Sequence, residues 1–121
     1  MKTDDNNIKI KKQKLNKLSV PILSGYLLID YDTILYLEAN NTYTIFHLTD
    51  DSMLTASKNL GYFEEKLIKE PFLRTHHSFI VNLIKVKEFK NIGDRGEVIL
   101  TNEQSIPVSR NRKDALLKLL K

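Results

Sequence analysis

The chain carries one dense run of side chains that could act on a ligand, from Arg74 through Thr75, His76 and His77 to Ser78. A histidine beside a serine could supply the base and the nucleophile of a hydrolase. Adjacent residues of a strand point to opposite faces, however, and no acidic residue close in sequence could orient the imidazole. A purely structural alternative is that one histidine packs inward and the other faces solvent. This alternative accounts for half of the polar run but gives no reason for Arg74. Because an apolar run follows directly, these polar groups stand at the mouth of a predicted strand, where they can meet a ligand.

A metal site or a cofactor is a weak interpretation of this sequence. Of the three histidines only His76 and His77 are near each other, and adjacent side chains diverge. The chain has no Cys, which excludes a disulfide, a thiolate zinc site and a cysteine nucleophile. Its four Gly are scattered, so the sequence has no Gly-rich phosphate loop. We therefore expect no catalytic residue, no metal ligand and no cofactor, and no enzymatic activity.

A second polar cluster, Asn40, Asn41 and Thr42, separates two predicted strands. Asn favours tight turns for local reasons, which would account for the cluster without any ligand. Asn can also pair with adenine and Thr can contact the thymine methyl group, so a DNA contact remains open. Nearby Glu38 has no second carboxylate at a paired spacing, which predicts a structural hydrogen-bond acceptor. His47 is predicted to lie on a strand face.

Charge is distributed unevenly along the chain. The formal net charge is +4, but residues 1–20 hold six Lys against two Asp, and residues 105–121 hold five cations against one Asp. The middle of the chain is acidic. Basic ends suggest a footprint for a polyanion on part of the surface, where phosphate contacts supply affinity without sequence information. A solvated tail would explain the basic start equally well.

Length and composition predict one domain after a polar start. A chain of 121 residues, 41% hydrophobic and 28% charged, fits one modest core. Residues 1–17 are predicted to be a basic polar tail or linker, and residues 18–121 the domain. No apolar run approaches the ~20 residues of a membrane helix, and no apolar segment follows the first Met. We therefore expect a soluble, cytoplasmic protein without a membrane partner.

Short apolar or alternating runs with turn residues between them predict a mainly β fold. Residues 59–69 interrupt this pattern with helical spacing, and Asn59 is the predicted N-cap. The apolar face of this helix comprises Leu60, Phe63, Leu67 and Ile68. The predicted strands are residues 26–30, 34–39, 43–49, 53–56, 79–82, 84–89, 97–101 and 105–108, with turns at 50–51 and 101–103 and a looser loop at 93–96.

A second predicted helix closes the chain. Ser109 can cap it, which places Arg110, Arg112 and Lys113 in its first turn. Exposed cations at a helix N-terminus oppose the macrodipole by roughly 0.3 to 1 kcal/mol each. An anionic ligand, such as a phosphate or a base edge, would resolve this conflict, and a surface helix that tolerates the cost is the alternative. Its apolar stripe comprises Leu116, Leu117, Leu119 and Leu120.

Three motifs in this order resemble those of the LytTR DNA-binding domain, the output module of bacterial response regulators of the LytR/AlgR family. Residues 34–44 (ILYLEANNTYT) resemble its opening motif, residues 72–82 (FLRTHHSFIVN) its most specific motif, and residues 106–110 (IPVSR) its closing motif. The resemblance implies an elongated, mainly β arrangement of small antiparallel sheets with two short helices. It also implies that loops enter successive DNA grooves and bend the DNA, without a helix-turn-helix.

The resemblance implies DNA contacts in three regions. Base reading would fall to Asn41 or Thr42 in the first turn, to His77, and above all to Arg110, because Arg forks onto guanine O6 and N7. His77 stands where the family often has Arg or Asn. The other predicted DNA-binding residues, most of them assigned to phosphates, are Arg74, His76, Ser78, Lys85, Arg112 and Lys113.

The function that follows is a sequence-specific transcription regulator that binds double-stranded promoter DNA at direct repeats, as paired copies. The family usually has an upstream receiver domain in a histidine-kinase pathway, which these 121 residues do not contain. An excised output domain, whose Lys-rich start resembles a linker, and a free-standing regulator would both fit. The alternative is a β-rich protein-interaction module that regulates another transcription factor. Affinity for duplex DNA that falls steeply with salt would favour the first class.

Overall fold

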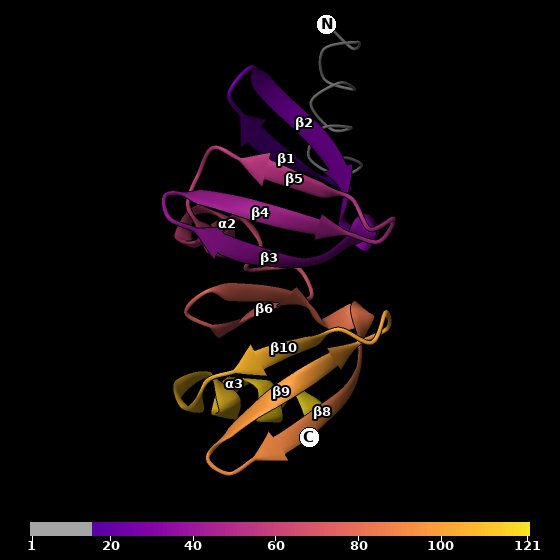
Figure 1. Ribbon diagram of the computed structural model, residues 1–121, viewed down its shortest axis with the longest axis vertical. Helices are drawn as coiled ribbons and strands as arrows, with labels where there is room; N and C mark the ends of the chain where they lie inside the picture. Colours follow the sequence, from indigo (N-terminus) through magenta and orange to yellow (C-terminus); the bar gives the residue numbers. More distant parts are fainter. Residues whose placement is uncertain (1–15) are drawn as a thin grey trace, which may run out of the picture.

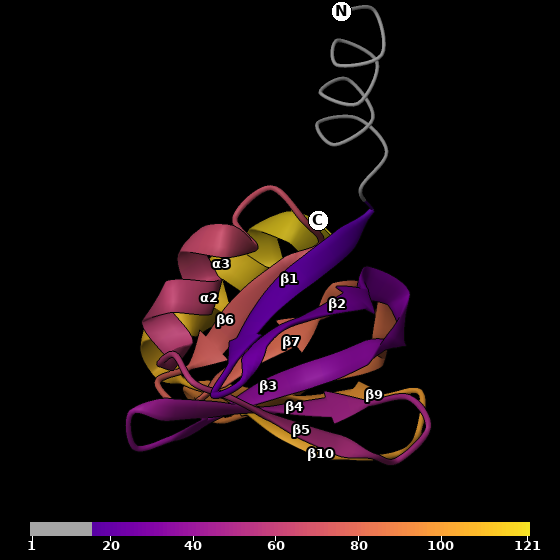
Figure 2. The same ribbon diagram turned by 90° about the horizontal axis from the view of Figure 1, so that it is seen from above.

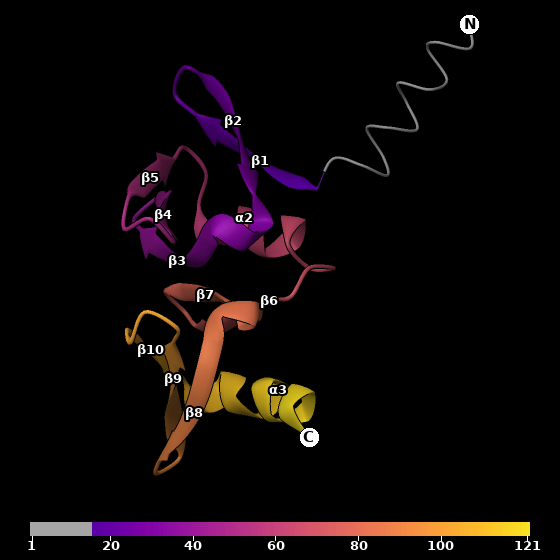
Figure 3. The same cartoon turned by 90° about the vertical axis from the view of Figure 1, so that its right-hand side faces the viewer.

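The computed structural model describes residues 16–121, and these form ten strands and two helices. The strands build three antiparallel sheets that follow one another along the long axis, with the β1–β2 hairpin at the top and the β8–β10 sheet at the bottom of Figure 1. Figures 2 and 3 show α2 and α3 on the same side of these sheets. The predicted elongated, mainly β fold with two short helices is confirmed.

A five-stranded sheet in the order β5-β4-β3-β7-β6 forms the middle of the molecule, and a three-stranded sheet in the order β10-β9-β8 forms its lower end. The elements are β1 (Lys17–Ile22), β2 (Gly25–Asp30), β3 (Ile34–Asn40), β4 (Tyr43–Leu48), β5 (Met53–Ala56), α2 (Leu60–Lys66), β6 (Phe72–His76), β7 (Phe79–Asn82), β8 (Val86–Ile92), β9 (Arg95–Leu100), β10 (Ser105–Val108) and α3 (Arg110–Leu120), with 3-10 turns η1 (Tyr31–Thr33) and η2 (Leu83–Lys85).

The β3 strand separates two hydrophobic cores and is buried on both faces. Ile34 and Leu37 belong to the upper core, which α2 covers, whereas Leu35 and Tyr36 belong to the lower core, which includes Leu116 of α3. A register shift between Ile34 and Tyr36 explains why two successive side chains reach the same core. Burial on both sides gives β3 its continuous apolar run.

Two strands were not predicted. The β1 strand alternates polar Lys17 and Ser19 with buried Leu18 and Val20, but its polar half resembles the Lys-rich segment before it. The β6 strand, Phe72–His76, lies in the polar run whose types drew attention to ligands rather than to pairing. Residues 17–20 of β1 follow the period of two that marks a half-buried strand, whereas a register shift between Arg74 and His76 interrupts that period in β6.

The region around β8 also differs from its prediction. The predicted strand 84–89 begins instead as the 3-10 turn η2, because the Asn82 side chain accepts a hydrogen bond from the Ile84 N–H (3.1 Å). The predicted loop 93–96 is shorter, since β8 and β9 pair as far as Ile92 and Arg95. Gly93 adopts φ 61°, the left-handed conformation that glycine accepts without strain.

The α2 helix begins as predicted and ends early. The Asn59 side chain accepts a hydrogen bond from the Tyr62 N–H at 3.0 Å, which confirms the N-cap. The helix ends at Lys66 rather than Lys69. Ile68 therefore lies beyond the helix and is 78% exposed, so its assignment to the apolar face was wrong.

The α3 helix occupies its predicted position and begins after the predicted cap residue. Ser109 is the N-cap residue, but its side chain makes no capping hydrogen bond. Leu116 is buried in the lower core, whereas Leu119 and Leu120 are 61% and 57% exposed, so the predicted apolar stripe is narrower than four leucines.

The predicted tail, residues 1–17, lies outside the described residues except at its end. Lys17 is the first residue of β1, and its Nζ lies 3.1 Å from a carboxylate oxygen of Asp30. Between residues 16 and 121, none of the helices has both the length and the apolar character required to cross a membrane.

Candidate nucleic-acid interface

Four chain reversals lie along one edge of the molecule, on the left in Figure 1. From top to bottom they are the β3–β4 turn, the β6–β7 turn, the junction between β10 and α3, and the β8–β9 turn. We call this the turn edge. Of the ten predicted DNA-binding residues, seven lie in these reversals or in the first turns of α3. Arg74 and His76 lie in β6, His76 as its last residue, and Lys85 lies elsewhere.

Backbone hydrogen bonds fix the upper three reversals relative to one another. The Ala39 N–H donates to the carbonyl of Ser78 at 2.8 Å and thereby joins the end of β3 to the β6–β7 turn. The Ser109 N–H donates to the carbonyl of Thr75 at 2.8 Å and joins the start of α3 to β6. Because main-chain bonds connect them, the three reversals form one continuous surface rather than three independent loops.

The β3–β4 turn contains only two residues between the paired Asn40 and Tyr43. Asn41 has φ 56°, the left-handed conformation that Asn tolerates better than most residues. This local reason accounts for one Asn of the cluster. The side chains of Asn41 and Thr42 are both exposed, and neither hydrogen-bonds to another residue within 16–121.

The β6–β7 turn separates the two histidines. The His76 ring is half-buried, its centroid lies 5.7 Å from that of Phe79, and its Nδ1 accepts a hydrogen bond from the Ser78 N–H at 3.0 Å. As an acceptor this Nδ1 carries no proton, so the ring proton is on Nε2. His77 is exposed. The structure therefore has the inward and outward pair that one interpretation of the sequence predicted.

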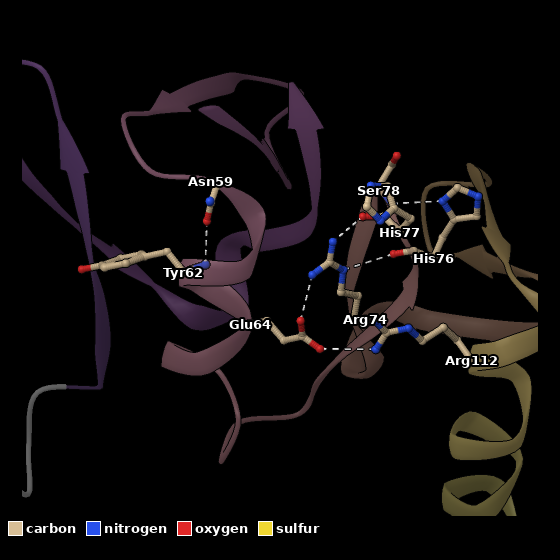
Figure 4. Close-up of polar contacts among 8 residues, drawn as sticks. All are labelled: Asn59, Tyr62, Glu64, Arg74, His76, His77, Ser78 and Arg112. Atoms are coloured by element: carbon tan, nitrogen blue, oxygen red, sulfur yellow. Dashed lines mark hydrogen bonds and ion pairs between the residues drawn. The ribbon is translucent and has the colours of Figure 1, made fainter. Parts of the chain in front are cut away.

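Arg74 points along the turn rather than out of it, as Figure 4 shows. One guanidinium nitrogen lies 2.8 Å from a carboxylate oxygen of Glu64, and the other donates to the carbonyl of His77 at 2.5 Å. Its Nε donates to the carbonyl of His76 at 3.4 Å. Only 13% of the Arg74 side chain is exposed, so this cation is engaged within the protein.

The start of α3 presents the exposed cations of the edge. The Arg110 side chain is 73% exposed, and its nearest carboxylate oxygen, on Asp94, is 3.7 Å away. Lys113 Nζ donates to the carbonyl of Gly93 at 3.3 Å, and Arg112 lies 3.4 Å from Glu64. Such exposed contacts contribute about 0 to 1 kcal/mol, so these groups offset only part of the conflict with the helix dipole.

Lys85 is not brought to the turn edge. It lies in η2, before the first residue of β8, whereas the β8–β9 turn follows the last. A strand of seven residues is roughly 23 Å long at ~3.3 Å per residue. The Lys85 carbonyl instead accepts a hydrogen bond from the Thr101 N–H (2.8 Å), next to the β9–β10 turn on the other side.

Sequence reasoning missed Glu64, Asp94 and Arg95. Arg95, the first residue of β9 after the β8–β9 turn, is 72% exposed and adds a cation to the edge. The spacing of Gly93, Asp94 and Gly96 marks this turn and could have indicated it. Glu64 gave no signal, because its partner Arg74 lies ten residues away on another element.

The polar residues behind the first turn are structural. Glu38 accepts from His47 at 2.8 Å, and the His47 ring stacks on Tyr36 with centroids 4.1 Å apart, which confirms the predictions for Glu38 and His47. Burial raises the pKa of Tyr36 above its ordinary value, although a hydrogen bond from Gln104 acts the other way. Among residues 16–121, no group of three or more His, Cys, Asp or Glu could hold a metal ion.

Comparison with known families identifies the domain. The family model described as the LytTr DNA-binding domain matches residues 24–121. The chain belongs to this family. It is 29% identical over 115 residues to the sensory transduction protein LytT of Oceanobacillus iheyensis, covering 93% of this chain and 47% of that protein. It is 30% identical over 106 residues to LytT of Bacillus subtilis, covering 87% and 44%.

A solved LytTr domain has the same fold. The LytTr DNA-binding domain of a putative methyl-accepting/DNA response regulator from Bacillus cereus superposes with a TM-score of 0.73 at 26% identity, covering 87% of this chain and 96% of that one. The LytTr domain is thus a DNA-binding output module of a transcription regulator, which confirms the resemblance. The chain spans less than half the length of the LytT proteins it matches.

Proposed function

We propose that the turn edge is the surface with which this LytTr domain reads promoter DNA, and that it performs no catalytic step. Asn41 or Thr42, His77 and Arg110 are the base readers, each from a different reversal. Arg110 pairs with guanine through its planar fork, and Asn41 suits adenine. Because the reversals follow one another along the molecule, the three readers enter successive grooves in that order.

The observation that carries this proposal is the pair of main-chain hydrogen bonds from Ala39 to Ser78 and from Ser109 to Thr75. Reading several bases with loops normally costs free energy, because each loop loses conformational freedom on binding. Here the reversals are already held in one frame. Their exposed side chains can therefore be matched to bases at a fixed spacing.

Phosphate contacts fall to the residues that flank the readers. Ser78 lies in the β6–β7 turn, and Arg112 and Lys113 lie on the start of α3. His76, the last residue of β6, offers its Nε2 proton beside the same turn. Arg112 uses one of its five donors on Glu64, so others can reach a phosphate. Lys85 is left out because it lies at the far end of β8, and Arg74 because its donors are engaged within the protein.

The larger setting follows from the relatives. We infer that paired copies bind direct repeats in a promoter, in the cytoplasm, as part of a response regulator whose receiver domain belongs to the upstream part of a longer protein. The relatives named sensory transduction protein LytT are more than twice as long as the matched region. Such a receiver would set how many copies are present on the promoter.

A selection of bound duplexes from a random pool tests the proposed function. We expect recovery of two similar short motifs in direct repeat, with affinity that falls steeply as salt rises. Lys118→Ala is the control variant, and it should select the same motif as the wild-type protein. This exposed lysine lies in the last turn of α3 rather than at its start. Recovery of no motif above background by the wild-type protein would contradict the proposal.

A further inference from the structure

We propose that Glu64 is a positioning residue for DNA reading: through Arg74 it fixes the β6–β7 turn that presents His77, and through Arg112 it holds the start of α3. The inference rests on the proposed function of the turn edge. Glu64 lies on α2, and its two carboxylate oxygens face two different arginines (Figure 4).

The chain of contacts begins with the placement of Glu64. The Asn59 cap fixes the first turn of α2, and the fully buried Phe63 ring packs edge-on against Phe46 with centroids 4.9 Å apart. Glu64 directly follows this anchored residue. Its carboxylate therefore occupies a defined position relative to the upper core.

The second link is the Arg74 guanidinium. Glu64 Oε1 accepts from one terminal nitrogen at 2.8 Å, while Nε donates to the carbonyl of His76 and the second terminal nitrogen to that of His77. A guanidinium is planar and its donors have a fixed geometry, so fixing one of them fixes the directions of the rest. The carboxylate thus sets where both carbonyls of the turn lie.

The ion pair between Arg74 and Glu64 stabilises this arrangement. With 13% of its side chain exposed, Arg74 is largely withdrawn from water and needs a compensating anion. Among residues 16–121, Glu64 is the acidic side chain within 4.0 Å of Arg74. Without it, the guanidinium would turn toward solvent or toward a phosphate and release the two carbonyls.

The third link is Arg112, whose guanidinium lies 3.4 Å from Glu64 Oε2. Arg112 is on α3 two residues after Arg110, so one carboxylate connects the turn of His77 with the helix of Arg110. Two of the proposed base readers therefore depend on the same acidic residue, which itself contacts no DNA.

This arrangement differs from a phosphate contact by Arg74 in its salt dependence. Loss of one phosphate contact reduces the slope of log affinity against log salt by about 0.9. Loss of a positioning residue leaves that slope unchanged and lowers affinity for the selected duplex relative to unrelated duplexes. Arg74→Gln is expected to behave in the second way and Lys113→Gln in the first.

The experiment compares Glu64→Ala with Glu65→Ala in the full chain. Glu65 is the exposed neighbour on the same helix, and its side chain makes no hydrogen bond or ion pair within residues 16–121. Both variants remove one negative charge, so both raise non-specific affinity alike. We expect Glu64→Ala alone to lose about tenfold in affinity for the selected duplex, close to the loss of one base contact.

A measurement on the free protein separates this inference from the proposed function. Amide NMR shifts of His77 and Ser78 should change in Glu64→Ala and stay in place in Glu65→Ala, measured at a temperature at which both variants are fully folded. Failure of the proposed function would appear as a wild-type protein that selects no motif, whatever these shifts do. Equal behaviour of the two variants in both assays, or a reduced salt slope in Arg74→Gln, would overturn the inference.

Discussion

Two edges of this domain are built from the same kinds of turn residue and differ in what those residues do. On the turn edge, the side chains of Asn41, Thr42 and His77 make no hydrogen bond to another residue within 16–121. On the opposite edge, the β4–β5 and β9–β10 turns bring together the hollow lined by Asp51, Ser52, Asn102 and Gln104, among others.

On the opposite edge, the side chains of Asp50 and Asn102 form hydrogen bonds within their own turns. Asp50 accepts from the backbone N–H (3.0 Å) and the hydroxyl (2.5 Å) of Ser52. Asn102 accepts from the Gln104 N–H (3.1 Å) and donates to its side chain (2.7 Å). Such local bonds explain the residue types without a ligand. Polar turn residues that leave their donors and acceptors unused are therefore the better sign of a binding edge.

The largest expected effect is at Arg110. Arg110→Ala should weaken binding to the selected duplex by roughly 1 to 3 kcal/mol and relax one base position. Lys113→Ala should weaken binding to all duplexes alike, since it removes a phosphate contact. Titrations against the selected duplex and its single-base variants measure both effects. Equal, sequence-blind losses from the two variants would sink the assignment of Arg110 to base reading.

The second prediction sets His77 against Asn102. His77→Ala should cost about 1 kcal/mol or more in specific binding and little stability, because the side chain is exposed. Asn102→Ala should lower stability by about 0.5 to 1.5 kcal/mol and leave DNA affinity unchanged, because it removes only internal hydrogen bonds. Paired binding and denaturation curves check this. The comparison fails if Asn102→Ala weakens DNA binding as much as His77→Ala.

A third pair uses two residues with positive φ. Asn41 has φ 56° and Asp51 has φ 69°, so Gly suits both backbones without strain. Asn41→Gly should reduce specific affinity by about 1 kcal/mol, and Asp51→Gly should not, since only the first removes a proposed base contact. Their unfolding free energies should change by similar small amounts. A reversed order of the two affinities would remove Asn41 from the interface and leave Thr42 as the reader of that turn.

The smallest effect concerns pH on the opposite edge. Hydrogen bonds from the Ser52 hydroxyl and N–H hold the pKa of Asp50 below its ordinary value. A lowered pKa in the folded state adds stability above the unfolded pKa, which is lost as pH falls through the folded pKa. Ser52→Ala should therefore raise the pKa of Asp50 in an NMR titration and leave DNA binding intact. An unchanged pKa would show that the hydroxyl contributes nothing there.

Local sequence patterns predicted much of the turn edge. The Asn59 cap, the Asn turn and the cations at the start of α3 are each determined within a few residues, and the three motifs gave the family. The β1 strand was missed because its alternating half resembles a Lys-rich segment, and η2 was read as strand because the Asn82 cap was not recognised.

Long-range contacts could not be predicted in this way. Arg74 pairs with Glu64, which the fold brings to it from α2, whereas the family resemblance implied a phosphate contact. Lys85 was predicted to contact DNA, but the seven residues of β8 separate it from the turn edge. Residue types indicated which side chains are polar, and the topology decided which of them meet.

The most direct test of the account is a specificity profile of three variants, Asn41→Gly, His77→Ala and Arg110→Ala, against every single-base change of the selected duplex. The account predicts that each variant loses discrimination at its own base positions, and that these positions follow the order of the reversals along the turn edge. Uniform losses across all positions, or overlapping positions for all three variants, would contradict it.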